Sequence, residues 1–341
     1  MRKLIVVAAA LAMAVSASVS AVAQPMPKVR IGTIVLSGIA PILVAVDRGY
    51  FKDEGLDAEI VDFQTAGAIS SAVISGDIDF GVSSFNAALF NLAGKGGLKI
   101  IAGVGTEMPG FKQYGYFVGN KAYEAGLKTL ADLKGKSVAL ATYGSAVHYT
   151  ILSAMRKYDI PKDAVRLMQT QTIANQLAAV LGGQADMGIL HVGQIAQLEA
   201  DGAGRTIAWA GEVESYAFSG MYTSPRVIKE KREIVEKTIR ALQKGAAEYN
   251  RVFNQRDAAG NFVRGPGYAE VMAALAPRIK VKDPDELAKM LGYADPAIQL
   301  DIDSLATQIA TWRDLGMVNQ GVDAKSIVDL SFIKPDASKS R

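Results

Sequence analysis

The segment Thr65 to Gly81 reads TAGAISSAVISGDIDFG, and at an offset of 107 residues the segment Thr172 to Gly188 reads TIANQLAAVLGGQADMG. Identical residues fall at Thr65/Thr172, Ala72/Ala179, Val73/Val180, Gly76/Gly183, Asp79/Asp186 and Gly81/Gly188. In both copies a threonine precedes an apolar helix pattern, glycine ends it, and a short strand follows. The match predicts two lobes built on one plan.

Strand and helix signals alternate on both sides of this repeat. Short strands rich in Val and Ile are predicted at 29–35, 58–63, 78–82 and 98–104, and again at 136–141, 164–168, 186–190 and 206–209. Helices between them indicate βαβ units, so the predicted fold class is α/β with a mainly parallel sheet flanked by helices in each lobe. From Ser224 onward, helix signals at 227–252, 268–275, 284–291 and 302–315 predict a helical jacket.

The N-terminus has the pattern of a secretory signal peptide. Arg2 and Lys3 precede the apolar run Leu4–Val15, and Ala21-Val22-Ala23 is a small-x-small cleavage signal. The run is shorter than the about 20 residues that a membrane-spanning helix needs. Because the chain contains no cysteine, disulfides and a lipidated cysteine anchor are excluded. We therefore expect cleavage after Ala23 and a freely diffusing protein in the periplasm.

The composition excludes several functional classes. The net charge is +3 and basic residues are spread among acidic ones, so nucleic acid is not an expected partner. His148 and His191 are the only histidines, which leaves no pattern for a metal site. No phosphate-binding P-loop occurs, and Met108 replaces the third glycine of a dinucleotide fingerprint after Gly103 and Gly105. We expect neither a metal nor another cofactor.

Ser145 and His148 raise the alternative of a catalytic pair. They lie three residues apart on a predicted helix and therefore share a face. No G-x-S-x-G elbow surrounds Ser145, so a hydrogen-bonding role is favoured over nucleophilic catalysis. We expect no catalytic residues.

Short Ser/Thr/Gly turns connect the strands to the helices that follow. They are Ser37-Gly38, Thr65-Ala66-Gly67, Ser83-Ser84, Thr142-Tyr143-Gly144-Ser145 and Thr172. Such turns lie at the carboxyl edge of a parallel sheet, where ligands bind, and none of them contains a basic residue. The alternative is that each Ser or Thr only caps a helix. His191 ends a strand at the same edge, and His148 lies one turn inside its helix.

Other polar residues nearby have structural interpretations. Asp79 and Asp186 each follow a glycine turn and are interpreted as repeated turn or cap residues. Trp209, Glu212 and Tyr216 follow the last predicted strand of the second lobe. They either line a ligand cleft between the lobes or pack at the hinge that joins the lobes, and the sequence leaves both possibilities open.

Three segments carry a resemblance to a known family. They are Asp47–Leu56 (DRGYFKDEGL), Ile74–Gly81 (ISGDIDFG) and Leu130–Lys136 (LADLKGK). Together they resemble the substrate-binding proteins of ABC importers for nitrate, sulfonates and taurine, a family that includes proteins similar to a thiamine-pyrimidine synthase. The cysteine-rich motif of the synthase branch is missing here, which argues against that activity.

The resemblance implies a two-lobed periplasmic-binding-protein fold, type II-like, that closes on its ligand. The signal peptide would occupy 1–23 and the first part of lobe one 24–113. Lobe two would occupy 114–222, with hinge crossovers at 114–118 and 218–222, and residues 223–341 would complete lobe one and add the C-terminal helices. The family's ligand contacts would map onto Ser37, Gly38, Thr65, Ser83 and Ser84 in lobe one and onto Gly144, Ser145, Asn175 and His191 in lobe two. The turn at Thr142–Ser145 and the helix that follows it add Tyr143 and His148 as candidate ligand contacts.

Composition, turns and resemblance together predict the solute-binding component of an ABC importer. We expect it to capture a small organic anion, such as a sulfonate or carboxylate, between its lobes. Its partner would be the permease in the inner membrane, and the protein itself would be a monomer. The alternatives are an enzyme on the same fold, of the pyrimidine- or cofactor-biosynthesis type, and a ligand-sensing subunit of a membrane receptor.

Overall fold

A computed structural model describes residues 25–34, 37–258, 262–279 and 283–333, and it contains two five-stranded sheets. Sheet A has the order β2-β1-β3-β10-β4 and sheet B the order β7-β6-β8-β5-β9. The strands of sheet A are β1 (Lys28–Thr33), β2 (Asp57–Asp62), β3 (Phe80–Ser84), β4 (Lys99–Glu107) and β10 (Tyr216–Thr223). Those of sheet B are β5 (Tyr114–Gly119), β6 (Ser137–Leu140), β7 (Arg166–Gln169), β8 (Met187–His191) and β9 (Gly204–Trp209).

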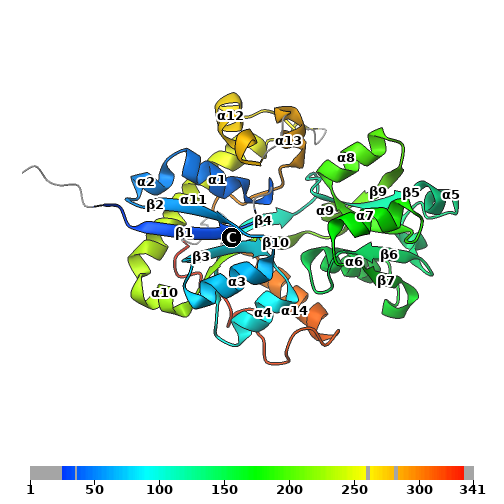
Figure 1. Cartoon of the computed structure of the whole chain (residues 1–341), viewed down its shortest axis with the longest axis horizontal. Helices are drawn as coiled ribbons and strands as arrows, with labels where there is room; N and C mark the ends of the chain where they lie inside the picture. Colours follow the sequence, from blue (N-terminus) through cyan, green and yellow to red (C-terminus); the bar gives the residue numbers. More distant parts are fainter. Residues whose placement is uncertain (1–24, 35–36, 259–261, 280–282, 334–341) are drawn as a thin grey trace, which may run out of the picture.

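The two sheets form separate lobes (Figure 1), which confirms the predicted fold class. The predicted signal peptide lies outside the described residues.

Helices flank both sheets. Lobe one carries η1 (Ser37–Ile39), α1 (Ala40–Asp47), α2 (Tyr50–Asp53), α3 (Ala66–Ser75) and α4 (Ala87–Gly94). Lobe two carries α5 (Asn120–Glu124), η2 (Leu130–Leu133), α6 (Ala146–Lys157), η3 (Lys162–Ala164), α7 (Ile173–Leu181), α8 (Val192–Ala200) and α9 (Ala210–Val213). The C-terminal part adds α10 (Pro225–Glu230), α11 (Arg232–Phe253), α12 (Tyr268–Ile279), α13 (Pro284–Met290) and α14 (Ile302–Arg313).

Each sheet contains one antiparallel strand that the sequence pattern did not predict. In sheet A, β10 pairs antiparallel with β3 and β4, whereas β1 pairs parallel with β2 and β3. In sheet B, β5 takes the same place between β8 and β9. Because β5 and β10 are strands, the chain passes between the sheets at 108–113 and 210–215, a few residues before the crossovers expected at 114–118 and 218–222.

The internal repeat extends to individual hydrogen bonds. The carboxylate of Asp79 accepts from the backbone N–H of Arg30 at 3.0 Å, and that of Asp186 accepts from the N–H of Ser137 at 2.7 Å. Arg30 and Ser137 are themselves 107 residues apart, as are the two aspartates. Both carboxylates thus tie a turn to the start of a neighbouring parallel strand, β1 in sheet A and β6 in sheet B, which confirms the interpretation of Asp79 and Asp186 as repeated cap residues.

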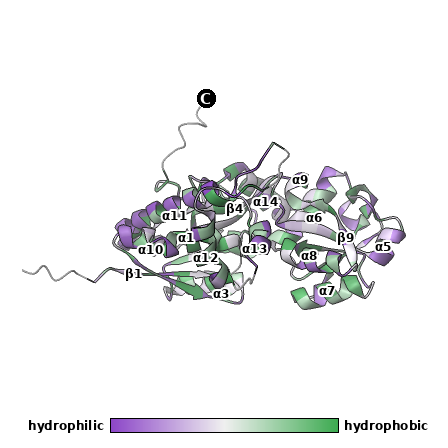
Figure 2. Cartoon of the chain, turned by 90° about the horizontal axis from the view of Figure 1, so that it is seen from above, coloured by the Kyte–Doolittle hydropathy of each residue, from purple (hydrophilic) through white to green (hydrophobic). Residues whose placement is uncertain are grey.

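The C-terminal helices return mainly to lobe one. Helices α11 and α12 pack on α1, and α14 packs on β10 and α4 while also reaching α6 of lobe two. Trp312 of α14 is fully buried at that junction. The outer surfaces of α10 and α11 are largely hydrophilic (Figure 2), as expected for a solvent-facing jacket. Within the described part of the chain, no helix combines the length and apolar character that a membrane crossing requires.

Candidate ligand site between the two lobes

The strand-to-helix turns of the two lobes meet each other. The backbone N–H of Ala87, at the start of α4, donates to the carbonyl of Gly144 in the turn after β6, at 2.9 Å. On another side of the junction, α8 packs against α13, with Gly193 close to the side chain of Met290. The lobes therefore touch directly around the region where the carboxyl ends of both sheets lie.

The predicted lobe-one residues differ in their surroundings. Gly38 is half-buried beside α1, and the backbone of Ser37 belongs to η1, although its side chain lies outside the description. Thr65 is exposed and caps α3 by accepting from the N–H of Ala68 at 3.2 Å. Ser84 is half-buried at the end of β3. Ser83 is buried, and its hydroxyl lies 3.4 Å from that of Tyr222 inside lobe one, away from the turns.

In the turn after β6, each of the three predicted residues, Tyr143, Gly144 and Ser145, has a contact within the protein. Tyr143 is exposed, and its hydroxyl donates to the carbonyl of Leu167 at 2.8 Å. Gly144 is buried against Ala87. The hydroxyl of Ser145 donates to the carbonyl of Thr142 at 2.8 Å and accepts from the N–H of His148 at 3.2 Å, so Ser145 caps α6.

The geometry of Ser145 and His148 is not that of a nucleophile and its base. Nδ1 of His148 accepts from the N–H of Gly144 at 3.0 Å, and the proton of the Ser145 hydroxyl is directed to a carbonyl. The neutral ring of His148 therefore carries its proton on Nε2, which is buried without a hydrogen-bond partner in the described structure. A serine hydroxyl is a weak nucleophile when no neighbouring base accepts its proton.

The remaining two predicted residues lie in lobe two. Asn175 is exposed, and its side-chain N–H donates to the carbonyl of Thr170 at 3.0 Å. His191 ends β8 and caps α8 with Nδ1, which accepts from the N–H of Gly193 at 3.3 Å. Its ring lies against Tyr114, with 5.4 Å between the ring centroids.

Two of the three residues left open by the sequence pack the junction between the lobes. The hydroxyl of Tyr216 lies 2.7 Å from that of Thr150 in α6, and the ring is buried. The carboxylate of Glu212 accepts from the N–H of Gly110 at 2.8 Å and so connects the two passages between the sheets. Trp209 is half-buried under the ammonium group of Lys112, which lies 5.7 Å from its ring centroid.

Sequence reasoning missed three residues at this junction. Tyr114 and Phe218 stack with 5.1 Å between their ring centroids, and they come from β5 of one lobe and β10 of the other. Glu107 ends β4, is fully buried, and has no hydrogen-bond partner for either carboxylate oxygen among the described residues. A signal for the two aromatic residues was available, since each stands in a segment assigned to a crossover. Nothing in the sequence pattern indicated that Glu107 would be buried.

The two histidines near the junction carry no positive charge at neutral pH. Burial lowers the pKa of His148 and of His191 to about 4, so both rings are neutral. Burial also raises the pKa of the Glu107 carboxyl to about 8, which favours its protonated form. The turns at the helix starts therefore offer hydroxyls, amides and neutral histidines, whereas the cations Lys112 and Arg156 lie beside Trp209 and Glu214.

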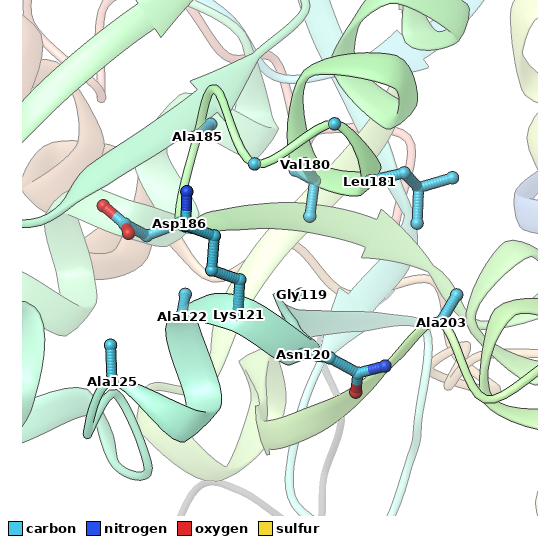
Figure 3. A pocket seen from close by; sticks show the side chains of 12 residues that line it. Gly119, Asn120, Lys121, Ala122, Ala125, Val180, Leu181, Ala185, Asp186 and Ala203 are labelled. Carbon is cyan, nitrogen blue, oxygen red and sulfur yellow. The ribbon is translucent and has the colours of Figure 1, made fainter.

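Neither of two cavities forms the site between the lobes. One lies away from the junction, and the other is too small for an organic ligand. A hollow of about 550 Å³ is lined by residues at the end of α7 and the start of α5, including Lys121, Leu181 and Asp186 (Figure 3). It lies at the edge of sheet B where β8 begins, opposite to the edge where His191 ends that strand. A second cavity of about 10 Å³ between Gly38 and Gln113 has room for about one water molecule. No group of three His, Asp or Glu within the described ranges could hold a metal ion.

Solved structures with the same architecture include transport proteins and one enzyme. The alkanesulfonate-binding protein SsuA from Xanthomonas axonopodis pv. citri, bound to MOPS, matches with a TM-score of 0.67 and 20% identity over 89% of this chain and 98% of that chain. The periplasmic nitrate-binding protein NrtA from Synechocystis PCC 6803 matches with a TM-score of 0.62 and 14% identity, covering 89% of this chain and 85% of that chain. The desulfurization enzyme DszB matches with a TM-score of 0.60 and 13% identity over 89% and 97% of the two chains.

At these identities the structures establish the fold alone. No curated protein matches the chain by sequence. A family model described as "NMT1/THI5 like" matches residues 37–251, which is more than half of the chain and includes both lobes. The chain therefore belongs to the NMT1/THI5-like family.

Proposed function

We propose that this protein is a periplasmic solute-binding component of an ABC importer and binds a small organic anion between its lobes. The observation that carries the proposal is the meeting of hydroxyl- and amide-bearing helix starts from both sheets at Ala87 and Gly144. The fold is shared with proteins whose names state sulfonate and nitrate binding, which supports the same role here.

An anion would be held by dipoles in this site. Helices α4 and α6 begin at the junction, and the start of a helix carries unpaired N–H groups and partial positive charge. None of the turns at 63–65, 84–86, 142–145 and 170–172 contains Lys or Arg, and His191 is neutral. Such a site favours a sulfonate or carboxylate that is released again, as a carrier for an importer requires.

Ligand contacts to both lobes would stabilise the closed arrangement. The lobes would open about the two passages at 108–113 and 210–215, which the hydrogen bond from the N–H of Gly110 to Glu212 joins. The closed form would then be the one that a permease in the inner membrane recognises. We expect the protein to act as a monomer, because each molecule contains both halves of the site.

The proposal is tested by thermal shift and calorimetry with methanesulfonate, benzoate and nitrate on the chain that begins at Gln24. A ligand present at 100 times its Kd stabilises the folded state by about 2.7 kcal/mol, so the Tm should rise by several degrees. Saturable one-to-one binding supports the proposal. Binding of neither methanesulfonate nor benzoate contradicts it, and binding of nitrate alone contradicts the organic anion.

The assignment of lobe two has its own test. The double variant Ser145→Ala plus His191→Ala should weaken binding at least about 10-fold, because it alters two helix starts that face the junction. Thr307→Ala removes a hydroxyl that bonds within α14 and should leave affinity unchanged. Unchanged affinity in the double variant would remove Ser145 and His191 from the site.

An enzyme remains the alternative, because DszB shares the fold. The internal bonds of Ser145 and His148 do not favour it. Conversion of a bound ligand into product by the purified protein, followed by chromatography, would decide for an enzyme and against a carrier.

A further inference from the structure

Three aromatic rings meet where the two sheets approach each other. Tyr114 stacks on Phe218 at 5.1 Å with an interplanar angle of 25°, and His191 meets Tyr114 edge to face at 5.4 Å and 78°. Tyr114 and His191 lie opposite each other on β5 and β8 of sheet B, whereas Phe218 comes from β10 of sheet A. We call Tyr114, Phe218 and His191 the interlobe aromatic cluster.

The cluster is deep in the molecule and still keeps accessible surface. All three residues are half-buried, although they lie between the lobes and not on an outer face. Burial raises the pKa of the Tyr114 hydroxyl, with a further contribution from the charge of Glu107, and burial lowers that of His191 to about 4. The surface that these residues keep accessible in such desolvated surroundings would be available to a ligand enclosed by the lobes.

We propose that the interlobe site selects a ligand with an aromatic ring, an aromatic carboxylate or sulfonate, whose ring lies against Tyr114, Phe218 and His191. This inference rests on the proposed function and specifies the ligand class of the same site. The acidic group would lie at the starts of α4 and α6, because the cluster itself offers no positive charge.

The chemistry of the cluster explains the selection. Aromatic rings attract one another through offset and edge-to-face contacts beyond what the burial of apolar area provides. A saturated ring of similar size buries comparable apolar area and lacks this additional attraction between aromatic rings. We therefore expect an aromatic acid to bind about 3- to 10-fold more tightly than its saturated analogue. Because the Tyr114–Phe218 stack joins the two lobes, a ring placed on it contacts both.

Calorimetry with benzoate and cyclohexanecarboxylate tests the inference, since the two have the same charge and differ in the ring. The wild-type protein should prefer benzoate about 3- to 10-fold, and Phe218→Leu should reduce this preference. Tyr114→Phe keeps the ring and should keep the preference. Phe262→Leu, which alters an aromatic contact with Tyr268 among the C-terminal segments, is the matched control and should also keep it.

Equal or tighter binding of cyclohexanecarboxylate by the wild-type protein would overturn the inference, and so would an unchanged preference in Phe218→Leu. If Phe218→Leu does not fold, Tyr114→Leu replaces it with the same expected result. Binding of methanesulfonate without binding of benzoate would overturn the aromatic selection and leave the proposed function intact. Failure of every carboxylate and sulfonate would overturn both.

Discussion

The two lobes share one plan, and they differ in what surrounds it. In lobe one the second carboxylate oxygen of Asp79 pairs with Lys231, at 2.7 Å, from the segment between α10 and α11. In lobe two Asp186 accepts instead from the hydroxyl of Ser137, also at 2.7 Å, on the neighbouring strand. The C-terminal helices thus complete lobe one with distant residues, whereas lobe two satisfies the same turn with its own.

The outer edges of the two sheets show the same difference. The guanidinium group of Arg226 covers Gly76 at the end of α3, whereas the corresponding Gly183 at the end of α7 borders the open hollow of about 550 Å³. A repeat therefore fixes the backbone of both lobes but not the partners of its side chains. Those partners depend on which later segment packs against each copy.

The largest expected effect concerns Glu107 and Glu214, which lie 107 residues apart and so occupy corresponding positions of the repeat. Glu214 bonds with Arg156 and Tyr149, whereas Glu107 is buried without a partner in the described structure. Burial raises the pKa of Glu107 from 4.5 to about 8. Between these values only the folded state holds the proton, so unfolding releases it and stability falls as pH rises, by roughly 1 kcal/mol per pH unit.

Glu107→Gln should remove this loss. In urea unfolding, the free energy of unfolding of the variant relative to that of the wild type should increase by several kcal/mol between pH 5 and pH 8. Glu214→Gln loses the ion pair with Arg156 and should be slightly less stable than the wild type at both pH values. Parallel pH profiles for Glu107→Gln and the wild type would show that Glu107 is not desolvated.

A smaller effect is expected at the glycines that are the second residues of the repeated strands β3 and β8. A Cβ at Gly81 would lie 2.5 Å from the ring of Tyr222 and 2.8 Å from Ile69, whereas at Gly188 the nearest atom would be 3.1 Å away on Val180. Gly81→Ala should therefore cost about 1–3 kcal/mol, and Gly188→Ala less than about 1 kcal/mol. Equal losses of Tm in the two variants would mean that the lobes are packed alike at this position.

The smallest effect separates the two partners of the repeated aspartates. Lys231→Gln removes a part-exposed ion pair and should cost less than about 1 kcal/mol, with the cost shrinking at high salt. Ser137→Ala removes a hydroxyl hydrogen bond and should cost about 1 kcal/mol at any salt concentration. Melting both variants with and without 1 M NaCl measures the difference. A salt-dependent loss in Ser137→Ala would contradict the proposed distinction.

Most of the fold could be predicted, because the strands β1–β4 and β6–β9 carry their own apolar patterns and turn residues. The strands β5 and β10 were assigned to crossovers, since each begins where the chain enters a sheet from the other lobe. Of the candidate site, the Ser/Thr turns were located correctly at helix starts. Their internal hydrogen bonds, such as that of Ser83 towards Tyr222, depend on contacts between distant segments.

The sequence by itself determined the two-lobed repeat, the helix caps at Thr65 and Thr172, and the absence of cysteine chemistry, because these depend on residues close together in the chain or on composition. Only the tertiary structure brought Tyr114, Phe218 and His191 together and buried Glu107 without a hydrogen-bond partner among the residues that the structure describes. The physical reason is that desolvation and ring contacts arise between strands that are far apart in the sequence. A local sequence pattern does not specify which distant strands pack together.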